Sequence, residues 1–470
     1  MQTASESPSA PEHSTRRIRT AAVTTLGCRL NQAESYQVLV QLAECGVNVV
    51  PFGEPADLTI VNTCTVTHVA DQQGRQLLRR ARRASPDGLV VAMGCYAQIA
   101  PNEVRRVEGV DVVIASGKSG LVPQLRALGL AIGGATSDEQ EASWRSGPDV
   151  LPATRVRHFV KVQDGCDDYC TYCIVPFARG HAVSLSPDEI VAEVQELEDR
   201  GCREVVLTGV QIGAFGRDRY AQRGQPLPPP GEPLAGLVRR ILRETTIARV
   251  RISSIQPQDW PPDFLELFGD PRLCPHLHLP LQSGCDAVLK RMGRRYSTSD
   301  FARFVERIRA RVPDVAITAD LIAGFPGETD ADHRASVGFV RAMEFADAHV
   351  FRFSARRGTA ASRMRDQVGM DVRKARSEEL RAVSANNAER FRRRFLGTAR
   401  RVLVEEELTV DAACSNGRRR WSGLTDNYLR VEIESPGDFL GRELPVRLRD
   451  LSRAGFVGEV ATDEEDVAHG

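Results

Sequence analysis

Short apolar runs alternate with helix-forming segments along most of the chain, and this alternation restricts the fold more than any other feature. Between residues 21 and 117 the runs are AAVTTLGC, LTIVNTC, LVVAMGC and GVDVVIASG. In the helical segment between the first two runs, Asn31 with Glu34 three residues later predicts the start, and Gly46 predicts the end. Strands that alternate with helices predict an α/β fold with a parallel, doubly wound sheet.

The alternation resumes between residues 154 and 390. The apolar runs there are RHFVKVQ, REVVLTG, RVRISSI, LHLPLQ, VAITADLIAG and AHVFRFS. Between the first two runs, Ser186 as N-cap, Pro187 in the first turn and Gly201 as stop predict a helix. Six strand–helix units are too few for a closed eight-fold barrel, so we expect a partial (β/α)6 barrel with an open side.

After about residue 397 the helical patterns end. Five short runs, ARRVLVEEE, RWSGLTDN, YLRVEIES, RELPVRLRDL and GFVGEV, predict a small antiparallel β-barrel. The expected parts are therefore a disordered tail over 1–17, an N-terminal α/β domain over 18–120, a linker with one helix over 121–152, the partial barrel over 153–392, the small barrel over 393–462 and an acidic tail over 463–470.

Composition narrows the class of protein. No apolar run approaches the ~20 residues of a membrane helix, and the N-terminal residues lack the apolar core of a secretory signal, so we expect a cytoplasmic protein without a membrane partner. In that compartment the 11 cysteines favour metal or redox chemistry over disulfides. The formal net charge is +0, so nucleic-acid binding would depend on local basic patches.

Three cysteines follow three different strands of the predicted N-terminal sheet. Cys28, Cys64 and Cys95 each stand at the carboxyl end of an apolar run or one to two residues beyond it. In a parallel sheet these ends share one edge, which is where ligands bind. The three thiols are therefore predicted to converge in space, although three unrelated core thiols at strand ends remain an alternative.

A second trio lies in one loop, DGCDDYCTYC, after the first strand of the predicted barrel. Cys166, Cys170 and Cys173 have the spacing C-x3-C-x2-C. Three thiolates can hold three corners of a four-iron, four-sulfur cube and leave one iron open for a small molecule. A zinc site with His158 or His181 as fourth ligand is the alternative, although no second C-x2-C pair follows.

The second trio resembles the cluster-binding loop of radical S-adenosylmethionine enzymes, in which the open iron chelates the cofactor. The stretches TLGCRLNQAES, VNTCTVT, MGCYAQ, DGCDDYCTYCIVPFARG, LTGVQIG, HLHLPLQSG and DLIAGFPGET together resemble the methylthiotransferases. GLTDNYLRVEI near the C-terminus is similar to a TRAM domain, which would be RNA-binding. The resemblance extends from about residue 21 to 460.

The resemblance implies two [4Fe–4S] clusters and S-adenosylmethionine as cofactors. One cluster would reductively split the cofactor to a 5′-deoxyadenosyl radical, which can abstract a hydrogen that no general base removes. The other would present sulfur, and a second S-adenosylmethionine would supply the methyl group. A low-potential electron donor and a sulfur donor are expected partners. The ligands would be Cys166, Cys170 and Cys173 for the radical cluster, and Cys28, Cys64 and Cys95 for the auxiliary cluster.

Within this family, TLGCRLNQAES and VNTCTVTHVADQQ look most like enzymes that methylthiolate C2 of N6-threonylcarbamoyladenosine beside the tRNA anticodon. The isopentenyladenosine enzymes more often have an Arg-containing segment after the Asn-Thr-Cys, where this chain has Thr-Val-Thr. The alternatives are an isopentenyladenosine methylthiotransferase, a radical enzyme with another substrate, and a non-catalytic iron–sulfur RNA-binding protein.

Four residues are expected near the cofactor. By resemblance, Tyr172 lies near its adenine, Thr208 and Gly209 meet its methionine end, and Gly324 lets the backbone approach the adenine. For both glycines a tight turn is the alternative.

A basic and aromatic stretch is the candidate surface for the tRNA anticodon stem-loop. Arg418, Arg419 and Arg420 precede Trp421, and Tyr428 follows nearby. Cationic and stacking side chains are what a structured RNA requires. A solvated hairpin tip is the alternative.

Overall fold

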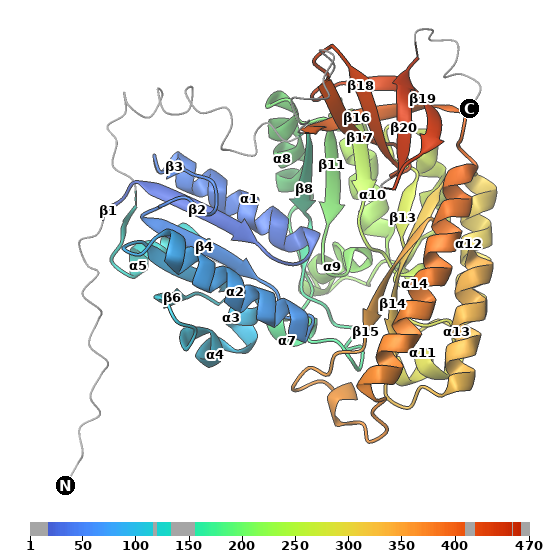
Figure 1. Ribbon diagram of the computed structural model, residues 1–470, viewed down its shortest axis with the longest axis horizontal. Coiled ribbons are helices and arrows are strands. Elements are labelled where there is room, and N and C mark those ends of the chain that lie inside the picture. Colours follow the sequence, from blue (N-terminus) through green and yellow to red (C-terminus); the bar gives the residue numbers. More distant parts are fainter. Residues whose placement is uncertain (1–16, 116–119, 133–155, 409–418, 454, 462–470) are drawn as a thin grey trace. The chain divides into compact units, whose positions relative to one another are not determined.

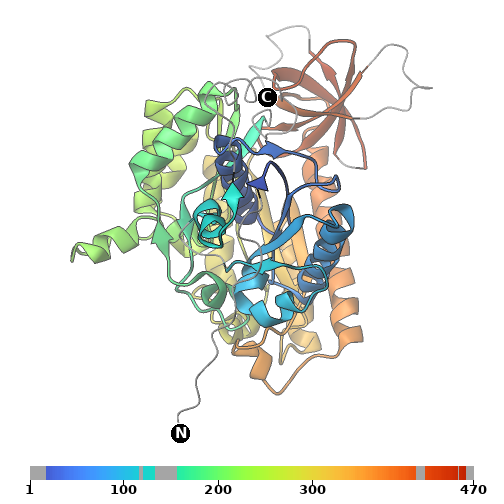
Figure 2. The same cartoon turned by 90° about the vertical axis from the view of Figure 1, so that its left-hand side faces the viewer.

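The computed structural model describes residues 17–115, 120–132, 156–408, 419–453 and 455–461. The chain forms two compact units, Met1–Pro152 and Ala153–Gly470. Figures 1 and 2 show the elements of both units in two views.

The first unit contains a five-stranded parallel sheet. The strand order is β3 (Asn48–Val49), β2 (Thr20–Thr25), β4 (Leu58–Thr63), β5 (Leu89–Gly94) and β6 (Val112–Val113). The helices are α1 (Arg29–Glu44), α2 (His68–Ala84), α3 (Cys95–Ile99), α4 (Pro101–Arg105) and α5 (Leu121–Ala127), and β1 (Arg17–Ile18) pairs with β7 (Ala131–Ile132). The parallel α/β sheet is confirmed.

Helices cover both faces of this sheet, because its central strands β4 and β5 are buried at every position. Ile60 packs with Leu42 of α1 and Leu125 of α5. The next residue, Val61, packs on the opposite face with Leu78 of α2. Successive strand residues point to opposite faces, so a continuous apolar run produces a doubly wound layer.

Two local features of the first unit differ from expectation. Helix α1 begins at Arg29 with Cys28 at its N-cap, whereas Asn31 lies inside the first turn; the predicted end at Gly46 is confirmed, with φ +73°. Residues 121–132, expected to begin the linker, instead pack into the core of this unit. The rest of the expected linker, residues 133–152, lies outside the described residues.

The second unit contains six parallel strands in two three-stranded sheets, of order β12-β11-β8 and β13-β14-β15. A bridge between Ser254 and His278 joins them into a partial barrel with β8 and β15 at its open edges. The strands are β8 (Arg157–Lys161), β11 (Glu204–Thr208), β12 (Arg249–Ile252), β13 (His276–His278), β14 (Ala316–Ala323) and β15 (Asp347–Arg352). The predicted (β/α)6 barrel is confirmed.

The barrel helices begin at strong N-terminal signals. The predicted N-cap at Ser186 is confirmed, and it forms a capping box with Glu189; Ser297 and Thr329 begin two more capping boxes. The longer helices are α8 (Pro187–Asp199), α10 (Glu232–Glu244), α12 (Thr298–Arg311), α13 (Asp330–Met343) and α14 (Met370–Arg393). Shorter elements are β9 (Gln163–Asp164), β10 (Val183–Ser184), α7 (Val175–Arg179), α9 (Arg217–Gln222), α11 (Asp286–Met292), and 3-10 turns at Ile212–Ala214, Pro257–Asp259, Pro262–Gly269 and Ala361–Arg363.

The predicted small barrel is closed and five-stranded, with Trp421 and Val431 among its buried core residues. The order is β16 (Ala399–Leu408), β17 (Arg419–Thr425), β18 (Arg430–Ser435), β20 (Phe456–Val460) and β19 (Glu443–Leu451). All pairings are antiparallel except β18 with β20, which run parallel. The longest connection of this barrel, residues 409–418, lies outside the described residues.

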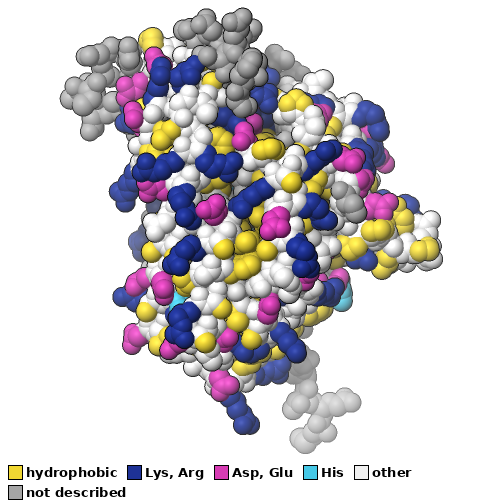
Figure 3. All heavy atoms as spheres, turned by 90° about the vertical axis from the view of Figure 1, so that its right-hand side faces the viewer, with side chains coloured by type: hydrophobic (Ala, Val, Ile, Leu, Met, Phe, Trp, Pro, Cys, Tyr) yellow, Lys and Arg dark blue, Asp and Glu magenta, His cyan; other side chains and the backbone are white. Residues whose placement is uncertain are grey.

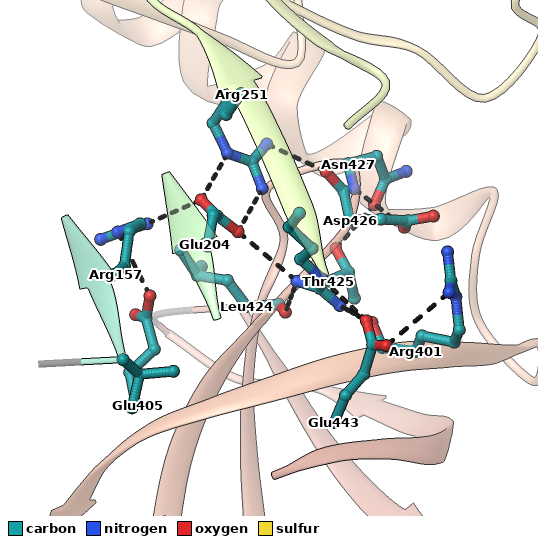
Figure 4. A network of polar contacts seen from close by, with 12 residues as sticks. Arg157, Glu204, Arg251, Arg401, Glu405, Leu424, Thr425, Asp426, Asn427 and Glu443 are labelled. Atoms are coloured by element: carbon teal, nitrogen blue, oxygen red, sulfur yellow. Dashed lines mark hydrogen bonds and ion pairs between the residues drawn. The ribbon is translucent and has the colours of Figure 1, made fainter. Parts of the chain in front are cut away.

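A buried ionic network joins the small barrel to the amino ends of two strands of the partial barrel (Figure 4). Glu204, at the start of β11, accepts hydrogen bonds from Arg251 at 2.8 and 3.1 Å. Arg251 also donates to the backbone oxygen of Asp426 at 2.9 Å, and Arg249 donates to the carboxylate of Glu443 at 2.8 Å. The small barrel is therefore fixed to the end of the partial barrel opposite the carboxyl ends of its strands.

Among the helices that the structure describes, none combines the length and apolar character needed to cross a bilayer.

Candidate metal centres and active site

The sheet topology of the first unit brings the trio Cys28, Cys64 and Cys95 to one edge. Cys64 directly follows the last residue of β4, and Cys95 directly follows the last residue of β5. Those two last residues, Thr63 and Gly94, are partners across the sheet. Cys28 follows β2, the neighbour of β4 on its other side. The three cysteines thus follow three adjacent strands at their carboxyl ends.

Close backbone packing brings the loops of this edge together. A Cβ atom placed on Gly27 would lie 3.1 Å from the Sγ of Cys64, so the loop that carries Cys28 touches the second cysteine. Gly94 has φ +92°, and a Cβ atom there would lie 2.4 Å from the backbone oxygen of Thr63. Only glycine therefore fits immediately before Cys95.

Two buried asparagines, which the sequence did not identify, support this edge. Asn31 donates to the backbone oxygens of Leu26 at 2.9 Å and Thr63 at 3.2 Å, and so ties the Cys28 loop to the end of β4. Asn62 donates to the backbone oxygen of Asn31 at 2.9 Å and to Ser35 at 3.0 Å. Both amides connect residues about 30 positions apart, which is why no local pattern reveals them.

Substitution of Gly94 by alanine is expected to destroy the auxiliary site. The new methyl group would meet backbone atoms at 2.4 and 2.8 Å in a left-handed conformation, at a cost on the order of 1–3 kcal/mol before any clash is relieved. Iron content after anaerobic reconstitution should fall from about eight to about four per chain. Gly74→Ala is the matched control, because its Cβ would meet only side chains at ordinary distances of 3.7 Å or more. Equal iron in both variants would contradict the expectation.

The trio Cys166, Cys170 and Cys173 lies in the loop after β8 and β9. The Cys166 amide donates to the backbone oxygen of Gly180 at 3.1 Å, and the Cys173 amide donates to the backbone oxygen of Cys170 at 2.9 Å. Between them, the Thr171 amide donates to the backbone oxygen of Met292 at 3.0 Å. The loop is therefore held at both ends and in the middle, at the carboxyl end of the barrel.

Ion pairs also hold the loop. Asp164 pairs with Arg179 at 3.0 Å and with Lys161 at 2.6 Å. Burial by itself would raise the pKa of Asp164, but the charges of Arg179 and Lys161 lower it below its usual value. Asp167 lies 2.6 Å from Nδ1 of His181, so this histidine is engaged with a carboxylate rather than with the cysteines.

The spacing of the thiols can be compared with that of a zinc site. Three thiolates on one zinc ion would lie within about 4.6 Å of one another, since each Zn–S bond is about 2.3 Å. Among the described residues, the group of three possible ligands whose atoms all lie within 4.8 Å consists of His278, Asp320 and His349, without a cysteine. Neither trio of described cysteines therefore has its three sulfurs within the spacing that a single zinc ion requires.

Two thiols of the second trio are protonated at neutral pH when no metal is bound. Burial raises the pKa of Cys166 and of Cys173 to about 12, and the neighbouring thiols add to the rise. Without metal these groups are neutral thiols, and binding of a cationic cluster must release their protons. The donor set thus fits a [4Fe–4S] cluster.

Two further side chains reach the cysteines of this loop. The Nη1 of Arg294 lies 3.4 Å from the Sγ of Cys170. The Sγ of Cys166 lies 3.6 Å from the Oε1 of Gln211. These contacts span 124 and 45 sequence positions, so the sequence alone did not reveal them.

The residues expected near the cofactor stand at the same end of the barrel. Tyr172 packs edge-to-face on Phe325, with ring centroids 6.5 Å apart. Thr208 ends β11, and Gly209 follows it. Gly324 follows β14 with φ +72°, and a Cβ atom there would lie 2.4 Å from the side chain of Arg373. Their roles in cofactor binding stay predictions.

The residues expected to contact RNA do not share one environment. Arg418 is outside the described residues. Arg419 pairs with Glu407 at 2.6 Å, and Arg420 pairs with Glu432 at 2.6 Å. The ring of Tyr428 stacks on His276, with centroids 4.3 Å apart, so it belongs to the joint between the two barrels. On the face drawn in Figure 3, cationic side chains are spread among acidic ones.

Comparisons with known proteins cover nearly the whole chain. The family described as "Radical SAM superfamily" matches residues 160–340, and "Uncharacterized protein family UPF0004" matches residues 20–115. "Threonylcarbamoyladenosine tRNA methylthiotransferase MtaB" of Bacillus subtilis is 34% identical over 93% of this chain and 95% of that protein. "tRNA-2-methylthio-N(6)-dimethylallyladenosine synthase" of Nitratidesulfovibrio vulgaris is 33% identical over 94% of this chain and 98% of that protein.

A solved structure shares the fold. The radical S-adenosylmethionine methyltransferase TsrM of Kitasatospora setae matches with a TM-score of 0.50 and 18% identity, over 71% of this chain and 72% of that chain. The sequence relatives extend across both units, and both cysteine trios lie in the matched residues. The chain belongs to the radical S-adenosylmethionine methylthiotransferases that modify tRNA.

Proposed function

We propose that this protein methylthiolates C2 of N6-threonylcarbamoyladenosine next to the tRNA anticodon. The observation that carries the proposal is the pair of cysteine trios, one at the carboxyl edge of the five-stranded sheet and one at the carboxyl end of the partial barrel. The Bacillus subtilis relative named for threonylcarbamoyladenosine and the Thr-Val-Thr after Cys64 support this substrate over the isopentenyl analogue.

The cofactors are two [4Fe–4S] clusters and S-adenosylmethionine. When bound, they supply a radical that removes an unreactive C–H hydrogen and the sulfur and methyl groups that replace it. The protein holds and orients them. In our proposal Cys166, Cys170 and Cys173 bind the radical cluster, Cys28, Cys64 and Cys95 bind the auxiliary cluster, and Tyr172, Thr208, Gly209 and Gly324 bind S-adenosylmethionine.

Arg419 and Arg420 of the small barrel are proposed to bind phosphates of the anticodon stem-loop. Each pairs with a carboxylate in the free protein, so phosphate replaces an existing partner. Such contacts weaken as salt concentration rises. A low-potential electron donor and a sulfur donor complete the proposed partners.

Cys64→Ala tests the function and the substrate together. Cells lacking the gene receive either the wild-type protein or the variant, and tRNA nucleosides are measured by mass spectrometry. We expect wild type to restore 2-methylthio-N6-threonylcarbamoyladenosine and the variant to restore none, because Cys64 is a ligand of the sulfur-presenting cluster. The purified variant should still form 5′-deoxyadenosine, since its radical cluster is intact. Restoration of the isopentenyl product instead would contradict the substrate, and methylthiolation by Cys64→Ala would contradict the ligand assignment.

A further inference from the structure

A cluster of His278, Asp320 and His349 lies on three neighbouring strands of the partial barrel. Nε2 of His278 is 3.0 Å from Oδ2 of Asp320, and Nδ1 of His349 is 3.2 Å from Oδ1 of the same carboxylate. Nδ1 of His278 lies 2.9 Å from the hydroxyl of Thr318. The three side chains thus form a hydrogen-bonded row whose central member is the carboxylate.

This row faces the inside of the barrel. On β14 the residues on either side of Asp320, Ala319 and Leu321, are fully buried, and on β15 the neighbour Val350 is buried where α14 donates to its backbone oxygen. Because successive strand residues alternate in direction, Asp320 and His349 point away from the covering helices. The His349 side chain is 56% exposed and stands on β15, an open edge of the barrel.

The row lies close to the proposed cofactor site. Ile322 is on the same face of β14, two residues beyond Asp320 toward the carboxyl end of the strand. Ile322 packs against the same small apolar cluster as Tyr172. Two strand residues span about 7 Å. A substrate that enters the open barrel and places its reacting carbon near the cofactor therefore has the row within reach of its substituents.

The chemistry of the row suits a polar ligand. Burial alone would raise the pKa of Asp320, but hydrogen bonds from His278 and His349 lower it well below its usual value, so the carboxylate is charged. The two imidazoles contact different oxygens of Asp320. Each imidazole therefore has its own carboxylate oxygen as partner, and the three side chains also offer ligand atoms within 4.8 Å of one another.

The names of the relatives supply two substituents to compare. A threonylcarbamoyl group carries a hydroxyl, a carboxylate and urea N–H groups, whereas a dimethylallyl group is a hydrocarbon. Covering charged and polar side chains with a hydrocarbon leaves their hydrogen bonds to water unreplaced, which is unfavourable. The two imidazoles and the carboxylate can exchange their hydrogen bonds to water for hydrogen bonds to a threonylcarbamoyl group. A dimethylallyl group offers no such replacement.

We propose that Asp320 and His349, with Asp320 held in place by His278, bind the polar substituent on N6 of the target adenosine and select it over an apolar one. Asp320 accepts hydrogen bonds from the urea N–H groups or the hydroxyl. His349 holds Asp320 through Nδ1 and, as an imidazolium, donates from Nε2 to the carboxylate of the threonylcarbamoyl group. His278 is a positioning residue, since it holds Asp320 and is itself held by Thr318. This inference rests on the proposed substrate.

The test measures binding of anticodon stem-loop RNAs to the anaerobic holoenzyme with S-adenosylmethionine. The RNAs share one sequence and carry adenosine, N6-threonylcarbamoyladenosine or N6-isopentenyladenosine at the target position. Wild type should bind the threonylcarbamoyl RNA most tightly. His349→Leu and Asp320→Asn should each weaken binding of that RNA by about tenfold or more, the effect of losing a charged hydrogen bond, and leave binding of the unmodified RNA unchanged.

His333→Gln is the matched control, because His333 lies on α13, where it pairs with Glu379 at 2.8 Å. This variant should retain the wild-type preference. If wild type prefers the threonylcarbamoyl RNA but His349→Leu and Asp320→Asn keep the same preference, the row has no selective role and the inference is wrong. If wild type prefers the isopentenyl RNA, the proposed function itself fails. Metal content is measured on the same samples. If wild type holds a metal ion in addition to the iron of its clusters, and Asp320→Asn lacks that ion, the row is a metal site and the inference is wrong.

Discussion

Cys170→Ala is expected to abolish formation of 5′-deoxyadenosine and to lower iron content from about eight to about four per chain. Only three thiols serve the radical cluster in our assignment, and the loss of one leaves two thiolates and two open corners. Nη1 of Arg294 also lies 3.4 Å from the Sγ of Cys170, so the substitution removes both a cluster ligand and a contact with a charged side chain. Product analysis and iron determination on the reconstituted protein check the result.

Cys285→Ala is the control for this experiment. Cys285 lies in the same unit and is also partly buried, but its thiol contacts Asp332 at 3.2 Å and no other cysteine. It should keep full iron content and full cleavage. If Cys170→Ala cleaved S-adenosylmethionine at the wild-type rate, the loop would not hold the radical cluster.

Glu204→Gln is expected to destabilise the joint between the two barrels by about 3–5 kcal/mol. Glu204 is completely buried, and its carboxylate balances Arg251, also completely buried, and Arg249. Removal of the charge leaves the buried guanidinium of Arg251 without its counter-ion, whereas Arg249 keeps its pair with Glu443. Hydrogen exchange of backbone amides over 419–435 should become faster, because these strands belong to the barrel that the network anchors.

The same carboxylate predicts a pH dependence. Burial alone would raise the pKa of Glu204, but the charges of Arg251, Arg249 and Arg157 lower it to about 2. An unfolded glutamate titrates near 4.5, so the network stabilises the folded state fully above that pH. The stabilisation is lost as pH falls from 4.5 toward about 2, and Glu204→Gln should show a weaker loss over this range.

Glu196→Gln is the control for Glu204. Glu196 pairs with Arg200 on the surface of α8, where its side chain is 59% exposed. Such exposed pairs contribute about 0–1 kcal/mol. Comparable exchange rates in both variants would indicate that the buried network does not anchor the small barrel.

The sequence alone was sufficient for the architecture. Apolar runs of strand length separated by capped helices predicted a parallel sheet, a six-unit open barrel and a small barrel, because hydrophobic periodicity and capping are local properties of the chain. The second cysteine trio was equally accessible, since Cys166, Cys170 and Cys173 lie within eight residues of one loop. The first trio required one more step, the rule that parallel strands end at a common edge.

The tertiary structure decided what local patterns cannot express. Tyr428, expected on an RNA surface, stacks on His276, because the docking of the small barrel determines which of its faces is covered. Asn31, Arg294 and the row of His278, Asp320 and His349 gain their partners from strands or loops distant in sequence. Residue types and spacing thus determined the chemistry that this chain can perform, whereas strand register and domain docking determined which side chains surround it, because those contacts form only when distant segments pack together.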